Sequence, residues 1–319
     1  MSSDVRARHA GSSQPTDRTD RREAVLLAAV LAAMYGLLAG APLVRGVPPV
    51  LGGMAVTVLF SAAALGIAAL AGRLRLTASS ELVGMLLGLG LWWLLAGLGE
   101  RRDTVRLLAV PAADVVFLLT CVWAGRLLSR IVRERNIMLP IALVLALADI
   151  FTVFVGPVAL FLHRAPEVVA HLSMKLPAVG SAAGPEGAAG LTHFAALGLG
   201  DVIFAALLLT GAARFGLNVR ATFGWMLGLV AAGLALFVAV PAIPPMPVLP
   251  LMALGFLIAN RGGFALSAEE RRIMAVAFGF VIVLLAALGL LAHSVVARMP
   301  APTSEAPTAE QPQQPGAAP

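Results

Sequence analysis

The sequence contains a single cysteine, a single lysine and few charged residues of either sign. Cys121 lies within an apolar run, which excludes a disulfide framework and a thiolate metal site, and we expect this thiol to take part in packing. Charged residues make up 13% of the 319 residues, whereas hydrophobic residues make up 59%. A soluble domain of this length needs far more polar surface, so the composition excludes a water-soluble protein.

Apolar runs long enough to cross about 30 Å of hydrocarbon recur along the chain. They predict an all-α fold class, a polytopic transmembrane helical bundle of about nine spans. We expect the spans at 24–44, 49–71, 82–98, 107–128, 137–163, 193–213, 219–241, 245–259 and 271–294. The first span follows a long polar segment, so we expect an uncleaved helix rather than a signal peptide.

The N-terminal and C-terminal segments of the chain lack apolar periodicity, and we expect both to be disordered tails. Residues 1–23 are polar, and residues 298–319 are rich in Pro, Ala and Gln. Between them we expect N-terminal transmembrane helices at 24–128, a core at 137–259 and an extra C-terminal helix at 271–294.

The basic residues, which are almost all arginine, lie between the apolar runs and predict the orientation of the chain. Basic residues are retained on the cytoplasmic side of a membrane. With a cytoplasmic N-terminus, the inside segments hold sixteen of the twenty-three basic residues, and Arg101, Arg102 and Arg106 are the main exceptions. We therefore expect a multi-pass protein of the plasma (inner) membrane with its N-terminus inside, and the basic balance does not favour nucleic-acid binding.

Three aspartates lie inside predicted spans, where an Asp at the helix centre costs about 2.5–3.5 kcal/mol to insert. They are Asp114, Asp149 and Asp201. No lysine or arginine is close to Asp149 or Asp201 within its span, so neither acid has an obvious ion-pair partner. Asp114 is expected to be a packing or pore-side acid that is hydrogen-bonded by its neighbours.

Asp149 and Asp201 lie on adjacent predicted helices, so their carboxyl groups could face each other across the interface. In a low dielectric such a pair shares one proton, because both carboxyls cannot ionise at close range. The ionised member can then take a proton from water while the protonated member hydrogen-bonds a scissile carbonyl. This chemistry requires no metal or cofactor, and His163, His171 and His193 do not have a ligand spacing on one helix face.

Two further features surround these acids in the sequence. Gly198 and Gly200 precede Asp201, where they would allow close approach of a substrate backbone or, alternatively, tight packing of a helix. Pro247-Val248-Leu249-Pro250 would carry extended backbone into the membrane and pair with an unwound substrate. A rigid turn between spans is the alternative interpretation of this proline segment.

Taken in order, these residues resemble the motifs of the presenilin and signal peptide peptidase family of GxGD intramembrane proteases. Asp149-Ile150-Phe151, with Val153-Phe154 and Gly156-Pro157, looks like the first aspartate motif. Gly198-Leu199-Gly200-Asp201, with Val202-Ile203-Phe204, looks like the second, and Pro247-Val248-Leu249-Pro250 is similar to the Pro-Ala-Leu motif. The resemblance covers about residues 137–259 and implies a presenilin-like bundle.

The resemblance implies an aspartic endopeptidase that hydrolyses peptide bonds inside the bilayer. Asp149 and Asp201 would be catalytic, and Gly198, Gly200, Pro247, Val248, Leu249 and Pro250 would bind the substrate. Substrates would be single-span membrane proteins or signal peptides, and whether accessory subunits are needed stays open.

The sequence departs from the family pattern at several points. Ala148 stands where the first motif has Tyr, and Val248 stands where the third motif has Ala. Four spans instead of five precede the first motif, so the Asp149 helix would run from inside to outside, as in signal peptide peptidase.

Three further functions are compatible with the sequence. A proton-coupled secondary transporter would use Asp149 and Asp201 as protonation sites and the proline-broken span as a binding element. A prepilin-peptidase-like protease would also be built on a G-x-G-D acid. A family member that has lost its activity would act as a chaperone or scaffold.

Overall fold

A computed structural model describes residues 15–101, 103–154, 173–177, 179, 193–240 and 247–298. The α-helices are α1 (Pro15–Gly40), α2 (Pro49–Arg73), α3 (Ala78–Arg101), α4 (Asp103–Ile131), α5 (Met138–Phe154), α8 (Leu199–Arg214), α9 (Val219–Ala239), α10 (Val248–Asn260) and α11 (Ala268–Arg298). Two short strands, β1 (Ser173–Pro177) and β2 (His193–Gly198), pair antiparallel.

Within the described ranges, seven helices are long and apolar enough to cross a membrane. Their candidate spans are Asp20–Leu43, Pro49–Arg73, Ala78–Gly99, Val105–Ile131, Arg135–Thr152, Val219–Ala239 and Ala268–Leu288. This confirms the predicted helical membrane bundle, and the chain is a multi-pass membrane protein. The two remaining predicted spans correspond to the shorter helices α8, of 16 residues, and α10, of 13 residues.

Helix α1 begins earlier than the apolar run predicts. Residues 15–23 were predicted to be part of a disordered tail, but α1 starts at Pro15. Proline fits the first position of a helix because its missing N–H would have no partner there. The added turns also bring Glu23 to Arg73 at the end of α2, with 3.3 Å between Oε1 and Nη1. The rest of the predicted tail, and the tail from Met299 onward, lie outside the described residues.

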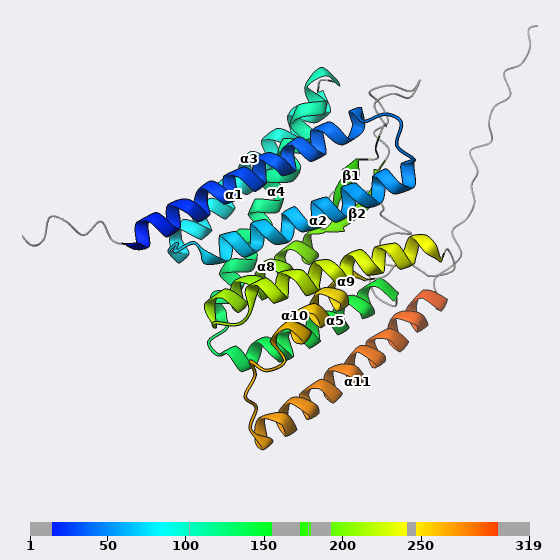
Figure 1. Cartoon of the computed structure of the whole chain (residues 1–319). Helices are drawn as coiled ribbons and strands as arrows, with labels where there is room; N and C mark the ends of the chain where they lie inside the picture. The colour runs from blue at the N-terminus through cyan, green and yellow to red at the C-terminus, as the bar shows by residue number, and fades with distance from the viewer. Residues whose placement is uncertain are drawn as a thin grey trace, which may run out of the picture.

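Helix α8 occupies the centre of the bundle, between the first four helices and the group formed by α5, α9 and α10 (Figure 1). It packs against α2 and α4 on one side and against α9 and α10 on the other. Nearly all of its middle is buried, including Leu208 and Leu209, which are 1% and 0% exposed. An all-round apolar helix of this kind is typical of a bundle interior.

Helices α3 and α11 lie at opposite edges of the bundle (Figure 1). Large apolar side chains on both helices are exposed, among them Trp93 at 76% and Val276 at 68%. Helix α11 lies against α5, and Asn136 before α5 donates to the carbonyl of Ala265 before α11 at 3.1 Å. In a bilayer such surfaces are covered by lipid tails, so their exposure fits a membrane protein.

Glycines allow the closest backbone approaches between helices. A Cβ added at Gly125 of α4 would clash with the carbonyl oxygen of Ile203 and would lie 2.9 Å from the amide of Leu207, both on α8. A Cβ at Gly255 of α10 would lie 2.7 Å from the amide of Met226 on α9. Small residues at such crossings are the usual basis of helix packing in membranes, where no hydrophobic force drives helices together.

A buried amide joins the last turn of α10 to the first turn of α9. Asn260, 3% exposed, donates from Nδ2 to Thr222 Oγ1 and to the Phe256 carbonyl, each at 2.8 Å. Its Oδ1 accepts from the Asn218 backbone N–H at 2.9 Å. Both donors and the acceptor of this side chain are therefore used, and they hold the two helix ends together.

Gly125→Ala is expected to lower the free energy of unfolding by about 1–3 kcal/mol, because the added methyl group overpacks the α4–α8 contact. Gly66→Ala in α2 is the matched control, since a Cβ there meets nothing within 4 Å. The control is expected to be neutral or stabilising by up to about 1 kcal/mol through helix propensity. Thermal unfolding in detergent measures both, and equal effects of the two substitutions would contradict the described crossing.

Candidate active site

Asp149 lies on α5 and is half-buried against the start of α10. Its Oδ2 accepts a hydrogen bond from the backbone N–H of Leu249 at 3.1 Å. Leu249 is the second residue of α10, and the first N–H groups of a helix have no partner within the helix. Asp149 therefore caps α10, although one hundred residues separate the two partners along the chain.

Asp201 lies in the first turn of α8 and is also half-buried. The helix is preceded by Gly198, whose backbone is extended with φ −70° and ψ 148°. Asp201 is the third helical residue, and its Oδ2 accepts from the Gly198 N–H at 3.1 Å. An acid at this position reaches back to the residue before the helix, as in one half of a capping box.

The structure brings these two acids together. Helix α10 packs against α5 and also against α8, so the helix ends that carry the acids converge. The carboxyl groups of Asp149 and Asp201 lie close enough to interact electrostatically. Each acid lies at a helix N-terminus, α10 for Asp149 and α8 for Asp201, where the helix dipole favours negative charge.

Gly198 and Gly200 leave space beside Asp201. Among the described residues, a Cβ added at Gly198 would meet only the Asp201 carboxyl, at 3.3 Å from Oδ2, and one at Gly200 would meet only the Phe204 ring, at 3.8 Å. Among the described residues, no other helix packs against either glycine. Of the two roles expected for these glycines, the structure therefore does not show tight helix packing.

The segment Pro247-Val248-Leu249-Pro250 reaches Asp149 as a helix start and not as extended backbone. Only Pro247 is extended, with ψ 134°, and Val248, Leu249 and Pro250 form the first turn of α10. The expectation of extended backbone is wrong for these three residues, because proline is tolerated in a first helical turn, where no N–H donor is needed. Residues 241–246, which complete the proline-rich segment, lie outside the described residues.

Extended backbone does occur at the site, in β2. The span predicted at 193–213 is wrong at its start, since His193–Gly198 is a strand paired with Ser173–Pro177 in the register Ser173↔Gly198. The cause is local: Gly198 ends the strand, and its bond to Asp201 sets the start of α8 at Leu199. Asp201 accordingly lies next to a strand end and not in the middle of a helix.

The remaining predicted features lie around this site or outside the described residues. Ala148 precedes Asp149 on α5, and Asp114 is half-buried on α4, a helix that carries neither motif acid. Residues 155–172, with Gly156, Pro157, His163 and His171, lie outside the described residues. In the part of the chain that the structure describes, no three His, Cys, Asp or Glu side chains gather as a metal site would require.

Sequence reasoning missed the two backbone donors of the site, the N–H groups of Leu249 and Gly198. One signal for the second was available, because a glycine followed three residues later by an acid is a helix-start pattern. No comparable signal exists for Leu249, since its partner is distant in sequence.

Comparison of the chain with protein-family models, with curated proteins and with solved structures finds no match.

Asp149→Ala is expected to lower the free energy of unfolding by about 0.5–2 kcal/mol, the usual cost of removing a helix cap. Asp149→Asn should be nearly neutral, because the amide oxygen can still accept from Leu249 N–H. Unfolding in detergent, followed by circular dichroism, measures the difference between the two variants. If alanine and asparagine destabilise equally, the capping role of Asp149 is wrong.

Proposed function

We propose that the protein is an intramembrane aspartic endopeptidase with Asp149 and Asp201 as its catalytic pair. One observation supports this most strongly: the three sequence motifs converge in space. Asp149 accepts from Leu249 in the proline motif, and its carboxyl interacts electrostatically with that of Asp201 behind Gly198 and Gly200. A chance arrangement of membrane acids has no reason to bring together segments that lie about fifty residues apart.

The chemistry follows from the arrangement of donors. Each acid uses one oxygen, Oδ2, to accept from a backbone N–H, and this leaves Oδ1 to act on water or on a scissile carbonyl. The backbone donors fix the orientation of both carboxyls before a substrate binds, and such preorganisation lowers the cost of reaching the transition state. The ionised acid acts as general base toward water, and the protonated acid donates to the carbonyl oxygen.

Strand β2 is the element that we propose to bind the substrate backbone. A peptide bond inside a helix is shielded, so a transmembrane substrate must unwind before attack. In the described sheet each strand has one unpaired edge, and β2 ends three residues before Asp201. An unwound segment that adds to such an edge gains main-chain hydrogen bonds and is directed toward the acids. Gly198 and Gly200 keep this approach free of side chains.

The proposed orientation places the N-terminus in the cytoplasm and the protein in the plasma (inner) membrane. The arginines at the ends of α2, α4 and α8 support it, because they gather at one end of the bundle. Single-span membrane proteins or signal peptides would be cut inside the bilayer by this arrangement.

One feature favours a second function, a proton-coupled transporter. The short helices α8 and α10 begin at the two acids, and the ends of broken helices form ion and substrate sites in transporters. The strand pair at the site favours the protease, since a carrier of small solutes has no use for an unpaired strand edge.

Asp149→Asn and Asp201→Asn are each expected to lower cleavage of a single-span substrate by at least about a hundredfold, because one acid cannot serve as base and acid in the same step. Both variants should stay folded, since asparagine keeps the acceptor for Leu249 or Gly198. Asp114→Asn is the matched control, a third membrane acid that should retain cleavage.

Cleavage by purified protein in detergent or liposomes measures all three variants. Near wild-type cleavage by Asp149→Asn or Asp201→Asn would remove that residue from the pair. Solute-dependent proton movement in liposomes, lost in both variants and without any proteolysis, would establish the transporter instead.

Val47→Cys and Arg133→Cys are expected to differ in their reaction with a membrane-impermeant thiol reagent on intact cells. Val47 precedes α2 and is 42% exposed, and Arg133 follows α4 and is exposed, so both thiols are accessible to solvent. The orientation predicts labelling at position 47 only, with both labelled after permeabilisation. Native Cys121 is buried and should not react. Labelling at position 133 only would establish the opposite orientation.

A further inference from the structure

A basic cleft of about 450 Å³ lies where the ends of α2, α4 and α8 meet the first turn of α3. Its volume falls within the range of about 300–1,000 Å³ that is typical of small-molecule sites. Five arginines line it against one acid: Arg73, Arg75, Arg126, Arg130, Arg214 and Glu81. Among the described residues, Glu23 lies outside the cleft and forms an ion pair with Arg73 but with none of the other four arginines. We call this space the arginine cleft.

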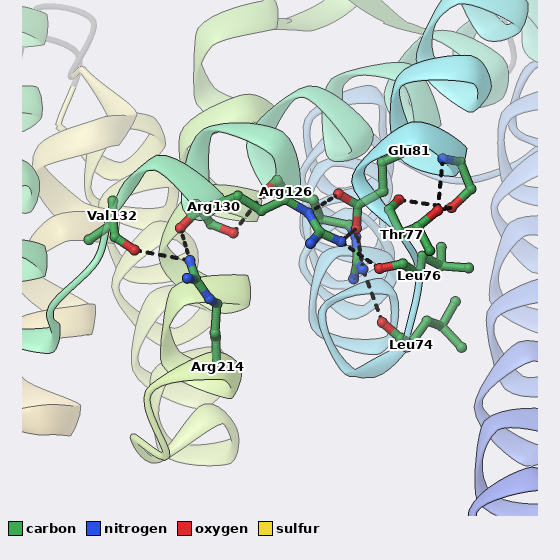
Figure 2. A network of polar contacts seen from close by, with 10 residues as sticks. Leu74, Leu76, Thr77, Glu81, Arg126, Arg130, Val132 and Arg214 are labelled. Carbon is green, nitrogen blue, oxygen red and sulfur yellow. Dashed lines mark hydrogen bonds and ion pairs between the residues drawn. The ribbon is translucent and has the colours of Figure 1, made fainter.

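Some of these arginines form ion pairs and hydrogen bonds within the protein, as Figure 2 shows. Glu81, 1% exposed, accepts from Arg126 Nη2 at 2.6 Å and from Arg130 Nε at 2.6 Å. Arg214 donates to the carbonyls of Ser129 and Val132 at the end of α4. These bonds join α3, α4 and α8, and cations at helix C-termini are favoured by the helix dipole.

Two buried polar groups at the arginine cleft are left without partners in the described structure. Arg126 is 4% exposed, and its Nε and Nη2 are bonded, but the donors on Nη1 have no acceptor. Thr210 of α8 is 6% exposed, and its hydroxyl also has no partner. A buried donor without an acceptor costs about 1–3 kcal/mol, and more when it is charged. Both groups are hydrogen-bond donors without an acceptor.

The Thr210 hydroxyl differs from those of three other described threonines. Thr57, Thr120 and Thr222 each donate to the carbonyl four residues earlier in the chain, at 2.8 Å. This local bond is the ordinary solution for a threonine inside a helix. Thr210 does not make it, so its hydroxyl is available to a group in the arginine cleft. Arg75, which also lines the cleft, is exposed and forms no ion pair with the described residues.

We propose that the arginine cleft binds a phosphate group, of the kind carried by an anionic phospholipid headgroup or by free phosphate. A phosphate offers several oxygens, which can accept from Arg126 Nη1, from Thr210 and from Arg75 together and balance the excess of positive charge. Basic pockets at the ends of membrane helices are suited to anionic headgroups. The arginine cleft is independent of the proposed catalysis, since it contains neither Asp149 nor Asp201.

The test uses the purified full chain in detergent, with lipid retention followed by native mass spectrometry. Phosphatidylglycerol is expected to be retained about tenfold more than phosphatidylcholine, whose cationic group would face the arginines. Arg75→Gln and Thr210→Val should each reduce this retention about tenfold, as loss of one charge-assisted hydrogen bond predicts. Arg133→Gln is the charge-matched control, because Arg133 is exposed at the same end but does not line the arginine cleft.

Thermal unfolding separates binding from folding and distinguishes the two sources of phosphate. Without ligand, Thr210→Val should be as stable as the wild type, since its hydroxyl has no partner in the protein. Stabilisation by sodium phosphate over sodium chloride of equal ionic strength, without preference between the lipids, would identify free phosphate. Equal losses of lipid retention in Arg75→Gln and Arg133→Gln would overturn the proposal. Unchanged binding of phosphatidylglycerol or of phosphate by Thr210→Val would overturn it as well.

Discussion

A helix that starts inside a packed bundle leaves N–H groups that water cannot easily reach, and the candidate site is built around this constraint. Helices α8 and α10 are both short, and each begins at a carboxylate: Asp201 for α8 and Asp149 for α10. The same bonds fix the orientation of two carboxyls that lie close enough to interact electrostatically. The acids thus stabilise the fold through Oδ2, and in the proposed function Oδ1 would act on water or on the scissile carbonyl, so one side chain could serve both roles.

Helix α8 connects the proposed catalytic site with the arginine cleft. Its first turn carries Asp201, and its last turns carry Thr210 and Arg214 at the arginine cleft. Its middle is packed on both sides, most closely where Gly125 of α4 meets the backbone of Ile203 and Leu207. The two sites therefore lie at opposite ends of one helix whose middle is packed on both sides.

Much of the fold could be predicted because hydrocarbon selects long apolar helices, and runs such as those of α2, α4 and α9 show this directly. Hydropathy could not separate β2 from α8, since the apolar residues of His193–Gly198 continue into the helix and the strand depends on pairing with residues 173–177. For the proposed site, the sequence favoured Asp149 and Asp201 because both are acids inside predicted spans with no ion-pair partner close in sequence. The bond between Asp149 and Leu249 depends on tertiary packing that no local pattern encodes.

The length of α8 bears on where a substrate would be cut. Thirteen residues separate Asp201 from Arg214, which is about 20 Å along a helix axis. An arginine at a helix end lies at the level of the headgroups, so in a hydrocarbon layer of about 30 Å the acid lies about two-thirds of the way across. With Arg214 on the cytoplasmic side, as proposed, hydrolysis at this depth would divide a substrate span unequally. The longer hydrophobic piece would stay with the cytoplasmic fragment and remain anchored in lipid, whereas the shorter piece on the other side would be too short to span the bilayer and could leave it.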